Sequence, residues 1–160
     1  MTDKEFDKFV KNQRYISREF IEKGYQFWFE DNEHVRSPFP KEIQETLRER
    51  SFRTFMEWTY ELTEEEKEQM KDEELVEMFE VLLFNEATKL IGKDDTESLL
   101  TINYPFLPRP GDEVNDQKEG LSKVRSRSVE KKKDDKVYMT IALETVSEGT
   151  SWETEFELPA

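Results

Sequence analysis

Residues 101–114 read TINYPFLPRPGDEV and hold three of the six prolines in this chain of 160 residues. Apolar residues recur every three or four positions before this stretch and every second position after it, the spacings typical of helices and of strands. Proline fixes its own φ and restricts the residue before it, so residues 105–112 must turn the chain. We therefore predict an α+β protein in which helices precede an antiparallel sheet.

The composition indicates a thin core. Apolar residues make up 34% of the chain and charged residues 39%, against about 25% charged in ordinary domains. Aromatic rings, at 12%, compensate because each buries a large area. Neither half has ample apolar surface alone. We expect one compact domain over residues 1–160, helical over 1–93 and β over 98–160, with Tyr104, Phe106 and Leu107 buried at the corner 105–112.

The cellular compartment of the protein is inferred from features that the sequence lacks. It has no cysteine, which excludes disulfides, thiolate zinc sites and cysteine nucleophiles, and is compatible with a reducing compartment. Residues 1–6 are too charged for a signal peptide. The longest apolar run, Val81 to Phe84, is far shorter than a membrane helix needs. We predict a soluble cytoplasmic protein.

Capping patterns predict three or four helices. Thr2 and Glu5 form a capping box, so a helix should begin at residue 3 and run to a bend or an end at Gly24. A second helix follows Pro38 and Pro40 from residue 41. Residues 63–66 form another box, after which 64–91 form either one helix or a short helix and a longer one. The apolar stripe of the first helix comprises Phe6, Phe9, Val10, Ile16, Phe20 and Ile21.

Alternating residues predict a meander of three or four strands, open or curled toward a small barrel, with the helices packed on one face. The first strand carries Leu100, Ile102 and Tyr104. A hairpin turns at residues 131–135. On each of the next three strands, one face is expected to carry apolar or small residues. These are Val124, Ser126 and Ser128 on the first strand of the hairpin, Val137, Met139, Ile141 and Leu143 on its return strand, and Trp152, Thr154, Phe156 and Leu158 on the last strand.

The main charge feature lies between Glu57 and Glu80, where eleven acids accompany only Lys67 and Lys71 within a chain of net charge −14. On one continuous helix, acids three and four residues apart stack on one face and repel one another. Such a stripe is either a solvated face or a site for a basic partner. The predicted partner-binding residues are Glu61, Glu65, Glu68, Asp72 and Glu77.

A basic hairpin over residues 123–136 carries the opposite charge, so it and the acidic segment 57–80 form two poles of charge. Its cations predict an alternative role in binding nucleic acid, although the net charge opposes this and the strand lacks interleaved stacking aromatics. Charged strands also protect sheet edges from aggregation. The two poles could pair between copies in self-association. The cations concerned are Lys123, Arg125, Arg127, Lys131, Lys132 and Lys133.

Catalysis has little support in the sequence. His34 is the only histidine, so a second alternative is an enzyme or metal site near it. The five glycines are far apart, which excludes the usual phosphate-binding loops. Acid pairs carry no information because 38 acids always provide some pair at a suitable separation. We predict no enzyme, no cofactor and no metal.

These observations predict a non-enzymatic protein–protein interaction or regulatory module, inhibitor-like or immunity-like, whose acidic helical face binds a basic protein. The analogy rests on charge alone.

Overall fold

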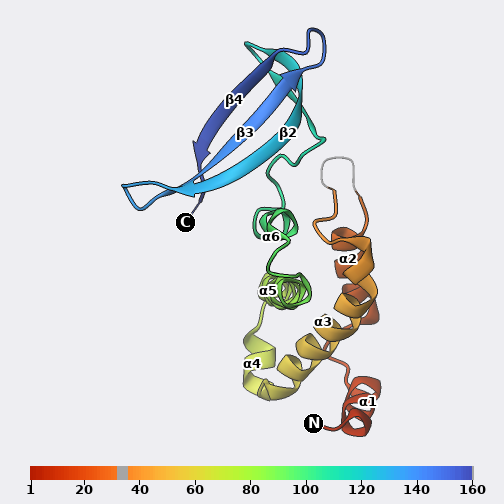
Figure 1. Cartoon of the computed structure of the whole chain (residues 1–160). Coiled ribbons are helices and arrows are strands. Elements are labelled where there is room, and N and C mark those ends of the chain that lie inside the picture. The colour runs from red at the N-terminus through yellow and green to blue at the C-terminus, as the bar shows by residue number, and fades with distance from the viewer. Residues whose placement is uncertain (32–35, 160) are drawn as a thin grey trace. The chain divides into compact units, whose positions relative to one another are not determined.

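The computed structural model describes residues 1–31 and 36–159, which form two compact units, Met1–Pro105 and Phe106–Ala160 (Figure 1). The division falls at the start of the predicted corner 105–112. Helices build the first unit and an antiparallel sheet builds the second. The predicted α+β class with a C-terminal meander is confirmed, and the single compact domain over 1–160 stays a prediction.

Six helices lie in the described part of the first unit, where three or four were predicted. They are α1 (Asp3–Asn12), α2 (Arg18–Phe29), α3 (Lys41–Glu61), α4 (Glu64–Gln69), α5 (Asp72–Leu90) and α6 (Thr96–Asn103).

The first predicted helix is two helices. It begins at the expected capping box, where Thr2 Oγ1 accepts the Glu5 N–H at 3.2 Å and the Glu5 carboxylate accepts the Thr2 N–H at 2.9 Å. The Gln13 side chain then closes a turn with Ile16, accepting its N–H at 2.8 Å and donating to its carbonyl at 2.9 Å. Ser17 caps α2 immediately afterwards. Polar side chains therefore interrupt an apolar stripe that is continuous in sequence.

Aromatic rings form the centre of the helical unit. Phe55 on α3 and Phe79 on α5 meet edge to face with centroids 5.4 Å apart, and Tyr25 on α2 meets Phe79 at 5.2 Å. The Tyr25 hydroxyl donates to the carbonyl of Arg48 on α3 at 3.1 Å. Burial raises the pKa of Tyr25 to about 12, so the hydroxyl remains protonated at neutral pH. Three helices thus meet at one ring cluster.

Gly24 lies inside α2, so of the two predicted alternatives, an end or a bend of a helix at this residue, the end is wrong. A Cβ atom at Gly24 would lie 2.7 Å from Cε1 of Phe79, closer than real Cβ atoms approach other atoms. The glycine is required because the Phe79 ring packs directly on the α2 backbone.

The predicted strand with Leu100, Ile102 and Tyr104 is wrong, because residues 96–103 form α6. Asp95 caps this helix by accepting the Ser98 N–H at 3.1 Å. Ile102 is 2% exposed and belongs to the helical core. Three alternating apolar residues were too short a pattern to outweigh a helix cap, and the β region begins only at residue 113.

The corner 105–112 is only partly as expected. Tyr104 and Leu107 are half-buried, but Phe106 is 67% exposed, so its predicted burial is wrong. At the other end of the corner, backbone hydrogen bonds of 2.8 Å link Gly111 and Asp112 to Val124. The last part of the corner is therefore fixed to the sheet.

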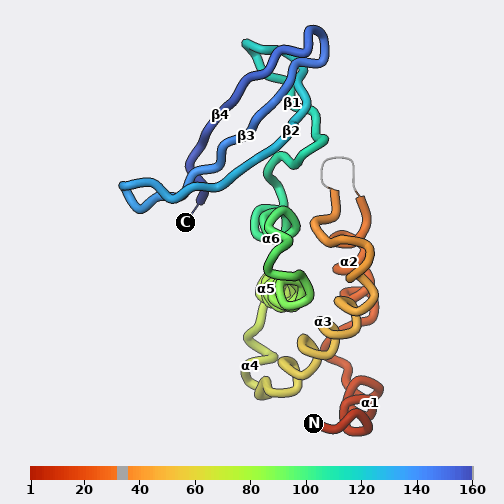
Figure 2. Tube along the Cα trace, in the orientation of Figure 1, coloured from red at the N-terminus to blue at the C-terminus, as the bar shows by residue number. Residues whose placement is uncertain are grey.

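Four antiparallel strands, in the order β1-β2-β3-β4, make up the described part of the second unit (Figure 2). They are β1 (Glu113–Asp116), β2 (Gly120–Lys131), β3 (Val137–Thr145) and β4 (Ser151–Glu157). The sheet is open, so the barrel-like alternative is not found. The predicted hairpin joins β2 to β3, and Asp135 adopts a φ of 64° in its turn.

Strand β2 changes face at a β-bulge. Its register against β3 shifts between Val124 and Ser126. Because a bulge adds one residue, the side chains beyond it exchange sides. Arg127 is consequently 9% exposed, while Ser126 and Ser128 are exposed. The predicted alternation is correct up to Val124 and wrong after it.

Replacing Gly24 by alanine should destabilise the helical unit. Overpacking a core costs about 1–3 kcal/mol, which outweighs the gain of about 1 kcal/mol that alanine brings to a helix interior. Urea unfolding should show a lower midpoint with an unchanged slope. Gly92→Ala is the matched control, because a Cβ at Gly92 meets nothing within 4 Å. Equal midpoints for the two variants would show that the Phe79 contact is not tight.

Candidate functional site: an acidic helical surface

The predicted acidic residues lie on three helices. Glu61 ends α3, Glu65 and Glu68 lie on α4, and Asp72 and Glu77 lie on α5. The chain leaves helical geometry at residues 62–63 and 70–71, so these acids do not form the continuous stack that one helix would give. Of the two alternatives for residues 64–91, the short helix followed by a longer one is found.

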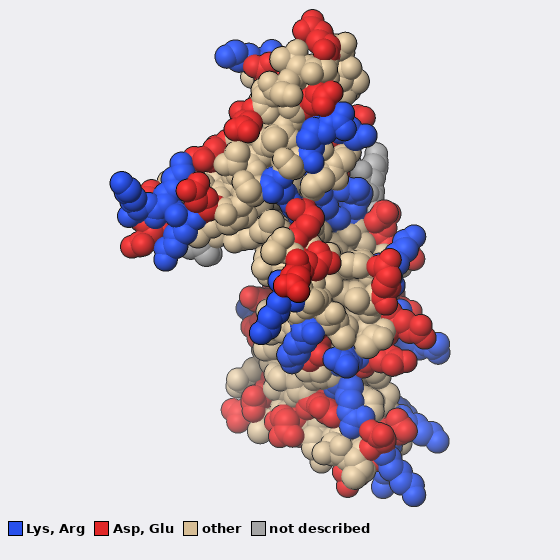
Figure 3. Space-filling view, viewed as in Figure 1, with Lys and Arg blue, Asp and Glu red and all other residues tan. Residues whose placement is uncertain are grey.

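A capping box causes the first break. Thr63 Oγ1 accepts the Glu66 N–H at 3.1 Å, and Glu66 Oε1 accepts the Thr63 N–H at 3.4 Å. These bonds begin α4 afresh, because the cap residue itself is extended with ψ at 162°. We name the exposed acids of residues 61–77 the acidic surface; acidic side chains are visible over α4 in Figure 3.

Few cations accompany the carboxylates of the acidic surface. Residues 61–77 contain nine Asp and Glu against Lys67 and Lys71. Within the described chain, the single ion pair of these acids joins Lys67 Nζ to Glu64 Oε1 at 3.5 Å. The whole first unit carries 26 acids against 15 Lys and Arg, a formal charge of −11, and residues 106–160 carry 12 against 9. Most of the negative charge therefore belongs to the helical unit.

Some of these acids have a local structural role. Residues 64–66 and 72–74 occupy the first turns of α4 and α5, where a carboxylate is stabilised by about 0.3–1 kcal/mol through the helix dipole. This group includes Glu65 and Asp72. By contrast, Glu61 and Glu68 lie near helix C-termini, where negative charge is unfavourable, and Glu77 lies mid-helix. The last three are the strongest candidates for contacting a partner.

Glu77, in the acidic surface, repels the neighbouring half-buried Glu80. The pKa of Glu80 is raised, mainly by burial, and the nearby Glu77 carboxylate raises it further, while a hydrogen bond from Trp28 acts in the opposite direction. Glu77 therefore imposes an electrostatic cost on its own helix.

The raised pKa of Glu80 predicts that Glu80→Gln increases the stability of the protein by an amount that depends on pH. A folded state that raises the pKa of an acid is destabilised above that pKa, and the penalty vanishes as the pH falls below the ordinary value of 4.5. The urea midpoint of Glu80→Gln should exceed that of the parent protein at pH 7 and approach it as the pH decreases toward 4. The exposed α3 variant Glu45→Gln serves as control. An increase in the urea midpoint that is the same at pH 7 and at pH 4 would contradict the raised pKa of Glu80.

Cations of the predicted basic hairpin are largely paired within the sheet. Ion pairs join Arg125 to Glu144 at 3.1 Å, Lys131 to Asp135 at 3.9 Å, and Lys132 to Glu155. Arg127 is buried, and its Nη1 donates to the Pro108 carbonyl at 2.9 Å. Of the six predicted cations, only Lys123 and Lys133 lack an ion pair or burial among the described residues. Three of the six predicted cations are thus paired with acids of the sheet, and the nucleic-acid and self-association alternatives stay predictions.

The alternative site near His34 falls outside the described residues. Across residues 1–31 and 36–159, no three Asp, Glu or His side chains are grouped so that they could hold a metal ion. No helix in the described chain is both long and apolar enough to span a bilayer.

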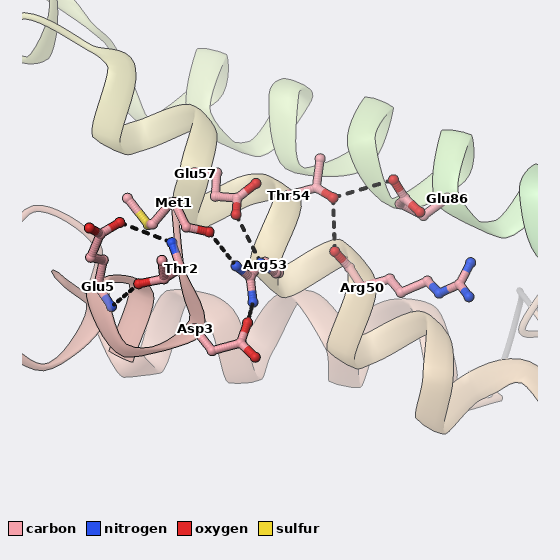
Figure 4. A network of polar contacts seen from close by, with 9 residues as sticks. All are labelled: Met1, Thr2, Asp3, Glu5, Arg50, Arg53, Thr54, Glu57 and Glu86. Carbon is pink, nitrogen blue, oxygen red and sulfur yellow. Dashed lines mark hydrogen bonds and ion pairs between the residues drawn. The ribbon is translucent and has the colours of Figure 1, made fainter. Parts of the chain in front are cut away.

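A polar network beside the acidic surface centres on Arg53, which the sequence patterns did not single out. Arg53 on α3 holds the start of α1 in place, with Nη1 2.6 Å from Asp3 Oδ1, Nε 2.9 Å from Glu57 Oε1 and Nη2 donating to the Met1 carbonyl at 3.1 Å (Figure 4). Its guanidinium also lies 4.8 Å from the centre of the Phe6 ring. Arg53 thus connects the first turn of α1 to the C-terminal half of α3.

Beside this network lies an open hollow of about 760 Å³, which we name the α1–α3 hollow. It is lined by Met1, Glu5, Thr54, Glu57, Trp58, Tyr60 and Glu61. The alternation of acids and aromatics in residues 57–61 is the only sequence signal for it. The contributions of Met1 and Glu5 arise from tertiary structure alone.

A second cavity, of about 450 Å³, lies among α1, α2 and α3 and has an apolar floor that includes Ile16, Ile21 and Met56. Arg48 pairs with Glu22 at 2.9 Å, and the Tyr25 hydroxyl bonds within the protein. Arg18 and Glu49 also line the cavity and have no ion pair among the described residues, so its unpaired charges are of opposite sign.

Neither a scan of protein-family models nor searches of curated proteins and solved structures found a match for this chain.

Proposed function

We propose that this protein is a non-enzymatic interaction module, regulatory in the manner of an inhibitor or immunity protein, that binds a basic protein through its acidic surface. The observation that carries the proposal is the contrast in pairing between the two units. In the sheet, Arg125, Lys131, Lys132 and Lys136 each pair with a neighbouring acid, whereas the nine acids of residues 61–77 are exposed and have one ion pair among the described residues.

The positions of three acids give further support. Glu61 and Glu68 oppose the helix dipole, and Glu77 raises the pKa of Glu80. None of the three therefore benefits the isolated fold. A basic partner would relieve these costs on binding, and a field of this sign would accelerate its approach.

Removing charge at these three positions should separate binding from stability. The variant Glu61→Gln, Glu68→Gln, Glu77→Gln should lose a basic partner from native lysate at low salt, while its thermal stability is equal to or higher than that of the parent. Exposed ion pairs contribute about 0.2–1 kcal/mol each, so loss of three should weaken binding roughly tenfold. Recovered proteins are identified by mass spectrometry and their isoelectric points compared.

The matched control removes the same charge elsewhere on the unit. Glu42, Glu45 and Glu49 on α3 are exposed and lack ion pairs within the described residues, so their replacement by Gln should leave the partner bound. Retention of the partner by the first variant would refute the proposal. Equal loss by both variants would refute it too, because binding would then depend on net charge rather than on the acidic surface.

A further inference from the structure

The α1–α3 hollow has the size and lining of a binding site. Its volume of about 760 Å³ lies within the range of about 300–1,000 Å³ usual for ligand sites. Residues from the first turn of α1 and the last two turns of α3 form its walls, and the Arg53 network holds these segments together (Figure 4). The hollow therefore belongs to a defined part of the fold.

Its charge selects for cations. Three carboxylates, those of Glu5, Glu57 and Glu61, line the hollow, and no Lys or Arg is among its lining residues. Glu5 and Glu57 use one oxygen each in the contacts already described, and Glu61 has no ion pair in the described chain. A carboxylate accepts about four hydrogen bonds, so acceptor capacity remains. The donors of the nearby Arg53 are directed to Asp3, Glu57 and Met1.

Two aromatic rings in the hollow are held in place from behind. Trp58 stacks on the buried Phe55 with centroids 5.7 Å apart, and Tyr60 meets Phe9 edge to face at 5.1 Å. Tyr60 nevertheless remains 54% exposed. Rigid aromatic faces attract ammonium and guanidinium groups, and Tyr and Trp are frequent anchors of protein interfaces.

We propose that the α1–α3 hollow receives a lysine or arginine side chain of the basic partner, with Trp58 and Tyr60 against its cationic group and Glu5, Glu57 and Glu61 around it. This inference rests on the proposed function and names the point at which the partner is anchored. The occupant is assigned to a protein because further unpaired acids, Glu68 and Glu77, continue on α4 and α5 and require more than one cation.

Nuclear magnetic resonance on the full chain can test the proposal with defined probes. A peptide with one arginine flanked by glycines should shift the indole N–H signal of Trp58 and the backbone signals of Tyr60 and Glu61 in a saturable way at low salt. The same peptide with glutamine in place of arginine should leave them unmoved. Free arginine amide serves as the small-molecule arm and should bind more weakly than a peptide with two spaced arginines.

Two variants test the residues of the hollow. Tyr60→Leu keeps an apolar group against Phe9 but removes the ring face, and should weaken peptide binding about two- to fivefold. Glu5→Gln with Glu61→Gln should weaken it about fivefold, and glutamine at position 5 still completes the capping box. The control Glu42→Gln with Glu45→Gln, on the exposed surface of α3, removes the same charge outside both the hollow and the acidic surface and should change binding less than twofold.

Several outcomes would overturn the inference: an unmoved Trp58 signal, equal shifts with the glutamine peptide, parent-like binding by both hollow variants, or free arginine amide binding as tightly as the two-arginine peptide. These outcomes are separable from failure of the proposed function. If the lysate partner is lost from the Glu61, Glu68 and Glu77 variant but the hollow variants bind normally, the acidic surface stands and the hollow does not.

Discussion

The helical unit depends on the close approach of α2 and α5, where the Phe79 ring lies directly against the backbone at Gly24. Only a residue without a Cβ permits this distance, and the approach brings Tyr25, Phe55 and Phe79 into one cluster of edge-to-face rings. Such pairs contribute about 0.5–1.5 kcal/mol beyond their buried area. In a chain with only 34% apolar residues, this aromatic centre supplies much of the cohesion that a larger aliphatic core would provide.

That cohesion opposes a considerable electrostatic cost. The first unit has a formal charge of −11, and self-repulsion of this kind destabilises a compact state. Helix dipoles offset part of the cost, because six of the nine acids in residues 61–77 lie in first turns. Glu61, Glu68 and Glu77 gain nothing of this kind. These three acids, which do not stabilise their helices, are the ones that we propose contact the partner.

Ion pairs are more common in the sheet than among the acids of α4 and α5, and the reason is structural. Neighbouring strands of a sheet place opposite side chains about 5 Å apart, so the long cations of β2 and its turn reach acids on β3 and β4. On α4 and α5, the acids of residues 64–77 have Lys67 as their one ion-pair partner among the described residues. Part of the positive charge of the basic hairpin is therefore paired within the sheet, whereas most of the acidic surface is unpaired.

The sequence by itself determined the α+β class, the first capping box, the start of α3 after Pro40, the hairpin between β2 and β3, and the faces of β3, because each depends on residues close together in the chain. It also located the acidic residues, though not their arrangement. Tertiary structure decided what local patterns could not. The bulge beside Val124 turned Arg127 inward, and the packing of the Phe79 ring on α2 requires a glycine inside that helix. The caps at Thr63 and Asp95, by contrast, are local contacts between residues three apart in the chain. The α1–α3 hollow forms where α1 meets α3, through the contact of Arg53 with Asp3, fifty residues away in sequence, and through the packing of Phe6 on Phe52 and of Phe9 on Tyr60. Spacing along the chain does not encode these contacts.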